Sequence, residues 1–155
     1  MDSFLQMKIS ADALSVQRVR MNTIASNLAN ANTTSSADGS GPYRRKDVIL
    51  EATPVAFKDM FESYTDDLDD SEKATLESVR SVKVLNIVDD NKEPTKVFDP
   101  NHPDADKDGF VSYPNISVME EMVNMISASR AYEANLSVMK TSKLMMDKAI
   151  SMINM

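Results

Sequence analysis

The last forty or so residues carry the feature that most restricts how this chain folds. From Ile116 to Met155 the sequence contains no glycine or proline. Apolar residues recur there at alternating steps of three and four, the heptad pattern of helices that pack on other helices. The stripe comprises Met122, Met125, Ser129, Tyr132, Leu136, Met139, Lys143, Met146, Ile150 and Ile153. Pro114 precedes it, and Ser117 with Glu120 forms a capping box. The pattern predicts one helix about 55 Å long at ~1.5 Å per residue.

A second stripe of the same kind lies near the N-terminus, from about Ser3 to Asn30. Its members are Met7, Ala11, Leu14, Arg18, Met21, Ala25 and Leu28. Because so long a helix cannot bury its stripe on a small local core, we predict that the two terminal helices pair as an antiparallel coiled-coil-like hairpin. Where such stripes form a seam, the charged members, Arg18 and Lys143, are hypothesised to fix register and partner choice at some cost in stability.

Between the helices the sequence predicts a small β-rich region, so the fold class is mainly α. Strand-like runs rich in valine, isoleucine and leucine occupy Tyr43–Glu51 and Val79–Val88. Two shorter runs, Val97–Phe98 and Gly109–Tyr113, form the arms of a predicted hairpin. The acidic tract at about 61–76 predicts a solvated loop.

The helices carry more apolar positions than one seam uses. The additional ones are Leu5, Ile9, Val16, Met119, Val123, Ile126, Val138, Met145 and Ala149. Exposed apolar surface of this extent indicates contact with further chains. We therefore expect a discontinuous helical assembly domain, 1–32 with 114–155, around an extended middle region, 33–113.

Composition excludes several classes of function. The 155-residue chain has a formal net charge of -7, which argues against nucleic acid as a partner. It contains no cysteine, and its single histidine, His102, lies in a proline-rich turn, so no catalytic triad and no cofactor is expected. No apolar run is long enough to cross a membrane, and the N-terminus lacks the pattern of a cleaved secretory signal. These observations alone predict a soluble, cytoplasmic protein that is not an enzyme.

One acidic loop resembles a calcium site. Asp104, Asp106 and Asp108 occupy positions 1, 3 and 5 of an EF-hand loop, and Gly109 follows at position 6. Position 12, which requires a bidentate glutamate, is Asn115, and the prolines upstream prevent an entering helix. An acidic turn is the better interpretation, and a calcium-responsive binding module is the alternative function.

Two polar clusters complete the candidates. The triplet Arg44, Arg45 and Lys46 predicts a solvated strand end that pairs with nearby carboxylates, rather than a phosphate site. Asn27 and Asn30, with Asn32, stand where asparagine satisfies the free carbonyls at the end of a helix.

Four segments together resemble one protein family. They are SNLANANT (26–33), GPYRRK (41–46), FDPNHPDADKDGFVSYPN (98–115) and EMVNMISASRAYEANL (121–136). The set is similar to bacterial flagellar rod and hook axial proteins, and within them to basal-body proximal rod proteins of the FlgC type. The positions that match the family motif are Ser26, Asn27, Leu28, Ala29, Asn30, Tyr43, Arg44, Pro100, Pro103, Gly109, Pro114, Asn115, Glu121, Met122, Ser129, Arg130, Tyr132 and Asn135. Phe98 stands where the family often has tyrosine.

This resemblance implies a structural subunit that polymerises head to tail through its terminal helices into the rod, the axial drive shaft that transmits torque. The implied partners are copies of itself, other rod proteins, basal-body ring and rod-adaptor components, and the flagellar type III export apparatus. Nucleic acid and direct membrane insertion are not implied. The family is exported without a cleaved signal, so the expected location becomes the basal-body rod that crosses the periplasm. The expected interface residues are Met7, Leu14, Arg18, Met21, Leu28, Met122, Met125, Tyr132, Leu136, Met139, Lys143, Met146 and Ile150.

Overall fold

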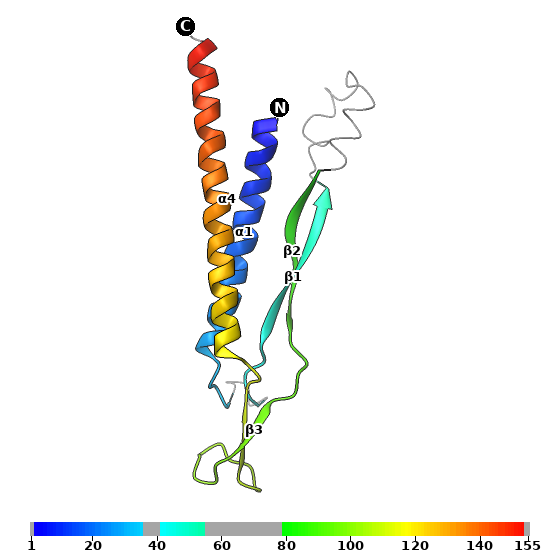
Figure 1. The fold of residues 1–155 in the computed structure, drawn as a ribbon. Coiled ribbons are helices and arrows are strands. Elements are labelled where there is room, and N and C mark those ends of the chain that lie inside the picture. Colours follow the sequence, from blue (N-terminus) through cyan, green and yellow to red (C-terminus); the bar gives the residue numbers. More distant parts are fainter. Residues whose placement is uncertain (1, 36–40, 55–78, 154–155) are drawn as a thin grey trace. The chain divides into compact units, whose positions relative to one another are not determined.

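A computed structural model of the chain describes residues 2–35, 41–54 and 79–153. A long helix stands at each end of the sequence, with four strands between them (Figure 1). The elements in order are α1 (Asp2–Ala29), β1 (Lys46–Pro54), β2 (Arg80–Asp89), β3 (Thr95–Phe98), β4 (Phe110–Tyr113) and α4 (Val118–Ile153). Two terminal helices around a small β-rich middle are confirmed, and the predicted acidic loop lies outside the described residues.

The ends of the helices have identifiable polar partners. Before α4, the Ser117 hydroxyl accepts a hydrogen bond from the Glu120 backbone N–H at 3.4 Å, which is the N-cap half of the predicted capping box. At the end of α1, the Asn30 side-chain amide donates to the Ser26 carbonyl at 2.9 Å. The same carbonyl also accepts the Asn30 backbone N–H at 3.1 Å, so the prediction that an asparagine satisfies a free helix carbonyl stays a prediction.

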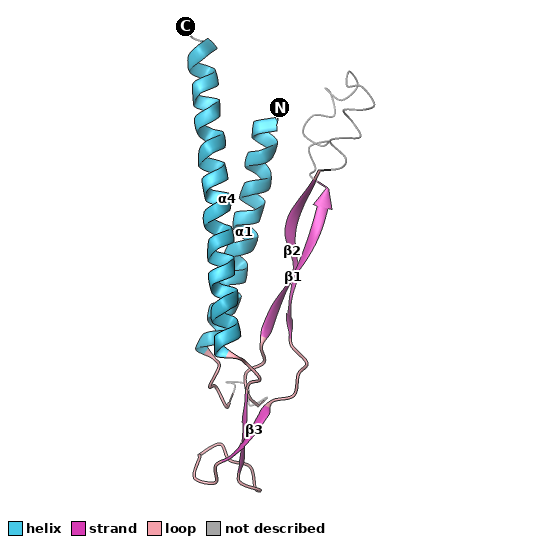
Figure 2. Ribbon diagram, viewed as in Figure 1, coloured by secondary structure: helices cyan, strands magenta, loops and turns pink. Residues whose placement is uncertain are grey.

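The strands form two separate two-stranded sheets, β1 with β2 and β3 with β4 (Figure 2). β3 and β4 pair antiparallel, so that Phe98 lies opposite Phe110. Their rings pack edge to face, with the ring centroids 5.3 Å apart. The loop between them turns at Gly109, whose φ is +78°. The predicted hairpin is confirmed. It buries Val111 completely and leaves Phe98 64% exposed.

The described chain groups into two compact units, and both helices contribute to each of them. The described residues of one unit are 2–17, 50–54, 79–85 and 131–153. Within it, the Ser81 hydroxyl of β2 donates to the Asp12 carboxylate of α1 at 2.7 Å. Ser81 is itself buried, so a partly buried polar interaction links β2 to α1 in this unit.

The second unit comprises Arg18–Ile49 and Asn86–Arg130. It contains the second half of α1, the beginning of α4 and the β3–β4 hairpin. The cluster of polar residues around Glu121, described below, lies in this unit.

Small and polar residues occupy much of the buried interior. The buried apolar residues of the described chain are Val16, Ile24, Ala31, Val111 and Ala128, and the buried polar ones are Ser10, Thr23, Asn27, Ser81, Glu121 and Ser142. Within the described residues, no helix combines the length and apolar character needed to span a membrane.

The buried face of α4 corrects one detail of the predicted stripe. Glu121, Ala128 and Ser142 are the buried residues of this helix, and their spacings of 7 and 14 place them on one heptad position. The stripe instead used the residues one position later, which include Met122 and Lys143, and both of these are exposed. The periodicity of large apolar residues does not predict this buried face, because the residues buried there are small or hydrogen-bonded.

Candidate functional site

A buried carboxylate marks the beginning of α4. The side chain of Glu121 is only 1% exposed, and a buried charge needs partners that replace its hydration. Arg45 supplies two of these partners, because its Nε and Nη2 donate to Glu121 Oε1 at 3.0 and 2.8 Å. Asn27 Nδ2 donates to Oε2 at 3.0 Å. Both carboxylate oxygens are therefore hydrogen-bonded.

Asn27, near the end of α1, uses its whole hydrogen-bonding capacity. Its amide nitrogen donates to Glu121 and to the Lys46 carbonyl at 2.9 Å. Its amide oxygen accepts from the Lys46 backbone N–H at 2.9 Å and from the Tyr43 hydroxyl at 3.1 Å. Two donors and two acceptors are all that an asparagine side chain offers. We call Asn27, Tyr43, Arg45 and Glu121 the polar clasp.

The carboxylate of Glu121 favours the charged form of the Arg45 guanidinium. Burial by itself lowers the pKa of Arg45, but the hydrogen bond and the negative charge of Glu121, with smaller contributions from Asp47, raise this pKa above its ordinary value. Asp47 lies 3.6 Å from Arg45 Nη1 and is largely exposed. The ion pair with Glu121 is therefore the stronger of the two, since it is the less exposed to solvent.

The polar clasp holds three segments together and leaves none of its groups poised for reaction. It joins the end of α1, the approach to β1 and the first turn of α4. A cavity of about 230 Å³ adjoins it, lined in part by Arg20, Lys46 and Asn124. Such a volume is large enough to admit water beside the polar clasp. The arrangement fixes the relative positions of these three segments.

The structure brings only some of the predicted motif residues together. Ser26, Asn27, Tyr43 and Glu121 meet at the polar clasp, where the Ser26 and Tyr43 hydroxyls are 3.2 Å apart. The others lie elsewhere: Leu28, Ala29 and Asn30 at the end of α1, Arg44 before β1, Pro100, Pro103 and Gly109 in the β3–β4 loop, Pro114 and Asn115 before α4, and Met122, Ser129, Arg130, Tyr132 and Asn135 on α4.

The sequence analysis includes Arg45 in the basic triplet but does not predict its burial. The basic triplet predicted pairing with carboxylates, and this is confirmed for Arg45. The prediction that it is a solvated strand end is wrong for Arg45, whose side chain is 20% exposed. The available signal was an acidic residue in the first turn of a long helix, Glu121, beside the more conspicuous Glu120 of the capping box.

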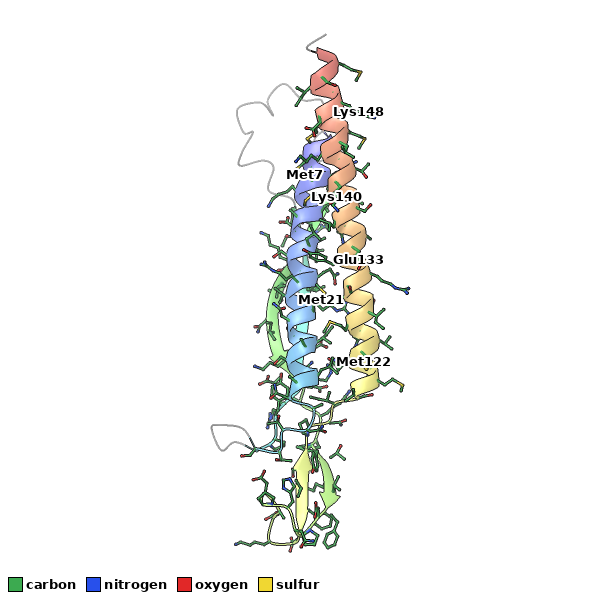
Figure 3. The ribbon with its side chains drawn as sticks, turned by 90° about the vertical axis from the view of Figure 1, so that its left-hand side faces the viewer. Met7, Met21, Met122, Glu133, Lys140 and Lys148 are labelled. Atoms are coloured by element: carbon green, nitrogen blue, oxygen red, sulfur yellow. The ribbon has the colours of Figure 1, made fainter. Side chains whose placement is uncertain are left out.

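The expected interface residues divide by exposure. Half-buried are Met7, Leu14, Met21, Leu28, Met125, Tyr132, Leu136, Met139 and Met146, and exposed are Arg18, Met122, Lys143 and Ile150. Figure 3 shows Met7 and Met21 on α1 and Met122 on α4. Arg18 and Lys143 are exposed in this single chain, so a seam in which they set the register would have to involve other chains. Their contact with other chains stays a prediction.

The loop that contains Asp104, Asp106 and Asp108 forms a turn. Asp104 Oδ2 accepts a hydrogen bond from the Thr34 hydroxyl at 2.7 Å, and Asp106 Oδ1 accepts one from the Lys107 backbone N–H at 2.7 Å. Asp104, Asp106 and Asp108 are all exposed. Over the described ranges, no group of three acidic, histidine or cysteine side chains is arranged to hold a metal ion. Asp106 therefore bonds within the turn, whereas Asp104 links the turn to the segment that follows α1.

Comparison with known proteins gives consistent matches along the chain. A family model for "Flagella basal body rod protein" matches residues 7–35, and one for "Flagellar basal body rod FlgEFG protein C-terminal" matches residues 107–152. The flagellar basal-body rod protein FlgC of Borreliella burgdorferi is 39% identical over 160 residues, covering 99% of each chain. That of Bacillus subtilis is 37% identical over 153 residues, covering 97% of each.

A third relative, FlgC of Salmonella typhimurium, is 35% identical over 144 residues, with 93% of this chain and 92% of its own covered. This chain belongs to the FlgC family of flagellar basal-body rod proteins. It is therefore a structural subunit of the rod and belongs in the flagellar basal body. The calcium-responsive alternative is not supported, because the relatives are named as rod proteins.

Proposed function

We propose that this FlgC-family chain polymerises head to tail through its terminal helices and so forms part of the axial drive shaft that transmits torque. In this proposal α1 and α4 pair antiparallel, and 1–32 with 114–155 form the assembly domain around the middle region 33–113. Head-to-tail contacts extend an assembly without closing it. Stiffness then comes from many parallel contacts between helices.

The exposed apolar surface of α4 carries this proposal. Among the described residues of this helix, ten large apolar side chains are at least 47% exposed: Val118, Met119, Met122, Val123, Ile126, Val138, Leu144, Met145, Ile150 and Met152. Water-exposed apolar surface on this scale marks an interface. A chain that exposes these residues while burying small and polar ones gains apolar burial when neighbouring chains cover α4.

The partners and the location in this proposal follow from the family. The partners are copies of this chain, other rod proteins, ring and rod-adaptor components, and the type III export apparatus, which would export the chain without cleaving a signal. The location is the part of the rod that crosses the periplasm. The polar clasp supports a role without catalysis, since its hydrogen bonds are satisfied internally.

The test is to replace Leu144, which is 61% exposed, by serine in cells that lack their own copy of the protein. We expect Leu144→Ser to reduce incorporation into isolated basal bodies by about 10-fold or more, since a buried leucine contributes roughly 1.5–3 kcal/mol and the position repeats in every subunit. Incorporation is measured by quantitative mass spectrometry of basal bodies, with swimming speed as a second readout.

The matched control is Lys83→Ser, at an exposed position of β2 outside the terminal helices. It should leave incorporation within about 2-fold of the unmodified chain, because an isolated exposed lysine contributes little. Equal incorporation of both variants would contradict the proposal that the apolar face of α4 forms the contacts.

A further inference from the structure

The first turns of α4 carry an apolar face turned away from the polar clasp. At about 100° per residue, Met119, Val123 and Ile126 lie roughly 140–200° around the helix from Glu121. They are 79%, 62% and 54% exposed. Met122, which is 54% exposed, widens this surface on one side. We call these four residues the α4 outer face.

The second half of α1 has an exposed surface on which most side chains are short, in contrast to the large apolar ones of α4. Arg18, Asn22, Ala25 and Ala29 lie roughly 160–220° around α1 from Asn27, and all four are exposed. We call them the α1 outer face. Three of these side chains are short and uncharged, so another helix can approach closely along this surface, where bulky side chains would hold it further away.

The two outer faces are complementary in size and in charge. Four large apolar side chains on one face fit a shallow surface with two alanines on the other, which is knob-into-groove packing. Arg18 forms no ion pair within the part of the chain that the structure describes. Glu120, exposed beside the α4 outer face, offers a charge of opposite sign.

A single chain cannot bring its own two outer faces together. Glu121 and Asn27 bond to each other at 3.0 Å, and each outer face lies on the opposite side of its helix from that contact. The α4 outer face therefore has to find its complement on another molecule. Because the two faces differ, a contact between them leaves one of each free and repeats indefinitely.

We propose that the α4 outer face of one copy packs on the α1 outer face of the next copy, so that the occupant of each face is a second copy of this chain. This inference rests on the proposed head-to-tail polymerisation and specifies the two surfaces that carry it. The polar clasp then also fixes the orientation of the two outer faces within each subunit, because it holds α1 and α4 together.

Disulfide crosslinking tests the pairing directly, because the natural chain contains no cysteine. The variant carries Ala25→Cys and Ile126→Cys together and replaces the natural copy in cells. After mild oxidation, isolated basal bodies are separated without reducing agent. We expect a ladder of covalent dimers and longer multimers, which disappears on reduction.

Three controls separate the pairing from chance contact. Ala25→Cys alone and Ile126→Cys alone should give no multimers beyond a dimer. Ala25→Cys with Ser137→Cys places the second thiol on an exposed position of the same helix, eleven residues away and about 16 Å along the axis. This pair should give at least about 10-fold less multimer than the pair with Ile126→Cys.

The pattern of crosslinked products distinguishes the proposed pairing from other contacts. A ladder confined to the pair with Ile126→Cys supports the proposal. Incorporation of the double variant into basal bodies without a ladder overturns the pairing of these faces and leaves the proposed polymerisation intact. Crosslinking to a different rod protein identifies another occupant and also overturns it. A natural chain that is absent from basal bodies would overturn the proposed function and this inference together.

Discussion

At the scale of single residues, the ion pair between Glu121 and Arg45 is the interaction most sensitive to substitution. In Glu121→Gln the guanidinium of Arg45 loses its buried counter-charge, and the new amide group faces the Asn27 donor. Removing one partner of a buried pair costs about 3–5 kcal/mol. Because Arg45 keeps some contact with solvent, we expect the free energy of unfolding to fall by about 2–4 kcal/mol. Urea titration followed by circular dichroism measures this.

The neighbouring Glu120 provides the matched control for that measurement. It is exposed, so Glu120→Gln should change the free energy of unfolding by less than about 0.5 kcal/mol. An equal effect of the two substitutions would show that general loss of negative charge near the start of α4, and not the polar clasp, is responsible.

Predictability from sequence differs sharply between the residues of the polar clasp. The role of Asn30 follows from its position at the end of a helix, because the bond it makes is local in sequence. The role of Arg45 depends on a partner 76 residues away, and no local pattern encodes such a contact. The buried face of α4 was missed for a related reason. Burial there follows hydrogen bonding and small size, which hydrophobic periodicity does not register.

At the scale of elements, the sequence predicts the helices and strands well, since their signals are local. Capping residues, heptad spacing and β-branched runs placed all six described elements. The β3–β4 hairpin shows how one residue can hold an element in place. A Cβ at Gly109 would approach the Phe98 ring to 2.9 Å and Pro100 to 3.3 Å. The positive φ of Gly109 also disfavours any L side chain.

We therefore expect Gly109→Ala to destabilise the hairpin by about 2–3 kcal/mol, of which roughly 1–2 kcal/mol comes from the backbone conformation and the rest from the contact with Phe98. Hydrogen exchange at the backbone amides of β3 and β4 measures this. Gly41→Ala is the control, since Gly41 also has a positive φ of 101° but nothing within 4 Å of the added carbon. A loss in Gly41→Ala as large as that in Gly109→Ala would mean that the ring contact adds nothing.

At the scale of the whole molecule, the helices are longer than the buried interior supports. α1 and α4 contain 28 and 36 residues, whereas five apolar residues among the described ones are buried, and two of them are alanines. Helical stability in proteins comes chiefly from packing of an apolar face. The chain before assembly is thus expected to hold its terminal helices weakly and to stabilise them when neighbours cover the exposed apolar residues.

Limited trypsin digestion of the full chain, free in dilute solution and in isolated basal bodies, tests this expectation. Cleavage after Lys140, Lys143 and Lys148, all exposed on α4, should be at least about 10-fold faster in the free chain, because cleavage requires local unfolding of the helix. Lys96 in β3 is the internal reference, since its hairpin pairs within the chain. Slow cleavage of all three α4 sites in the dilute chain would instead identify a finished two-helix domain that is stable before assembly. In that case the exposed residues of α4 would serve recognition alone, and folding and assembly would be separate steps.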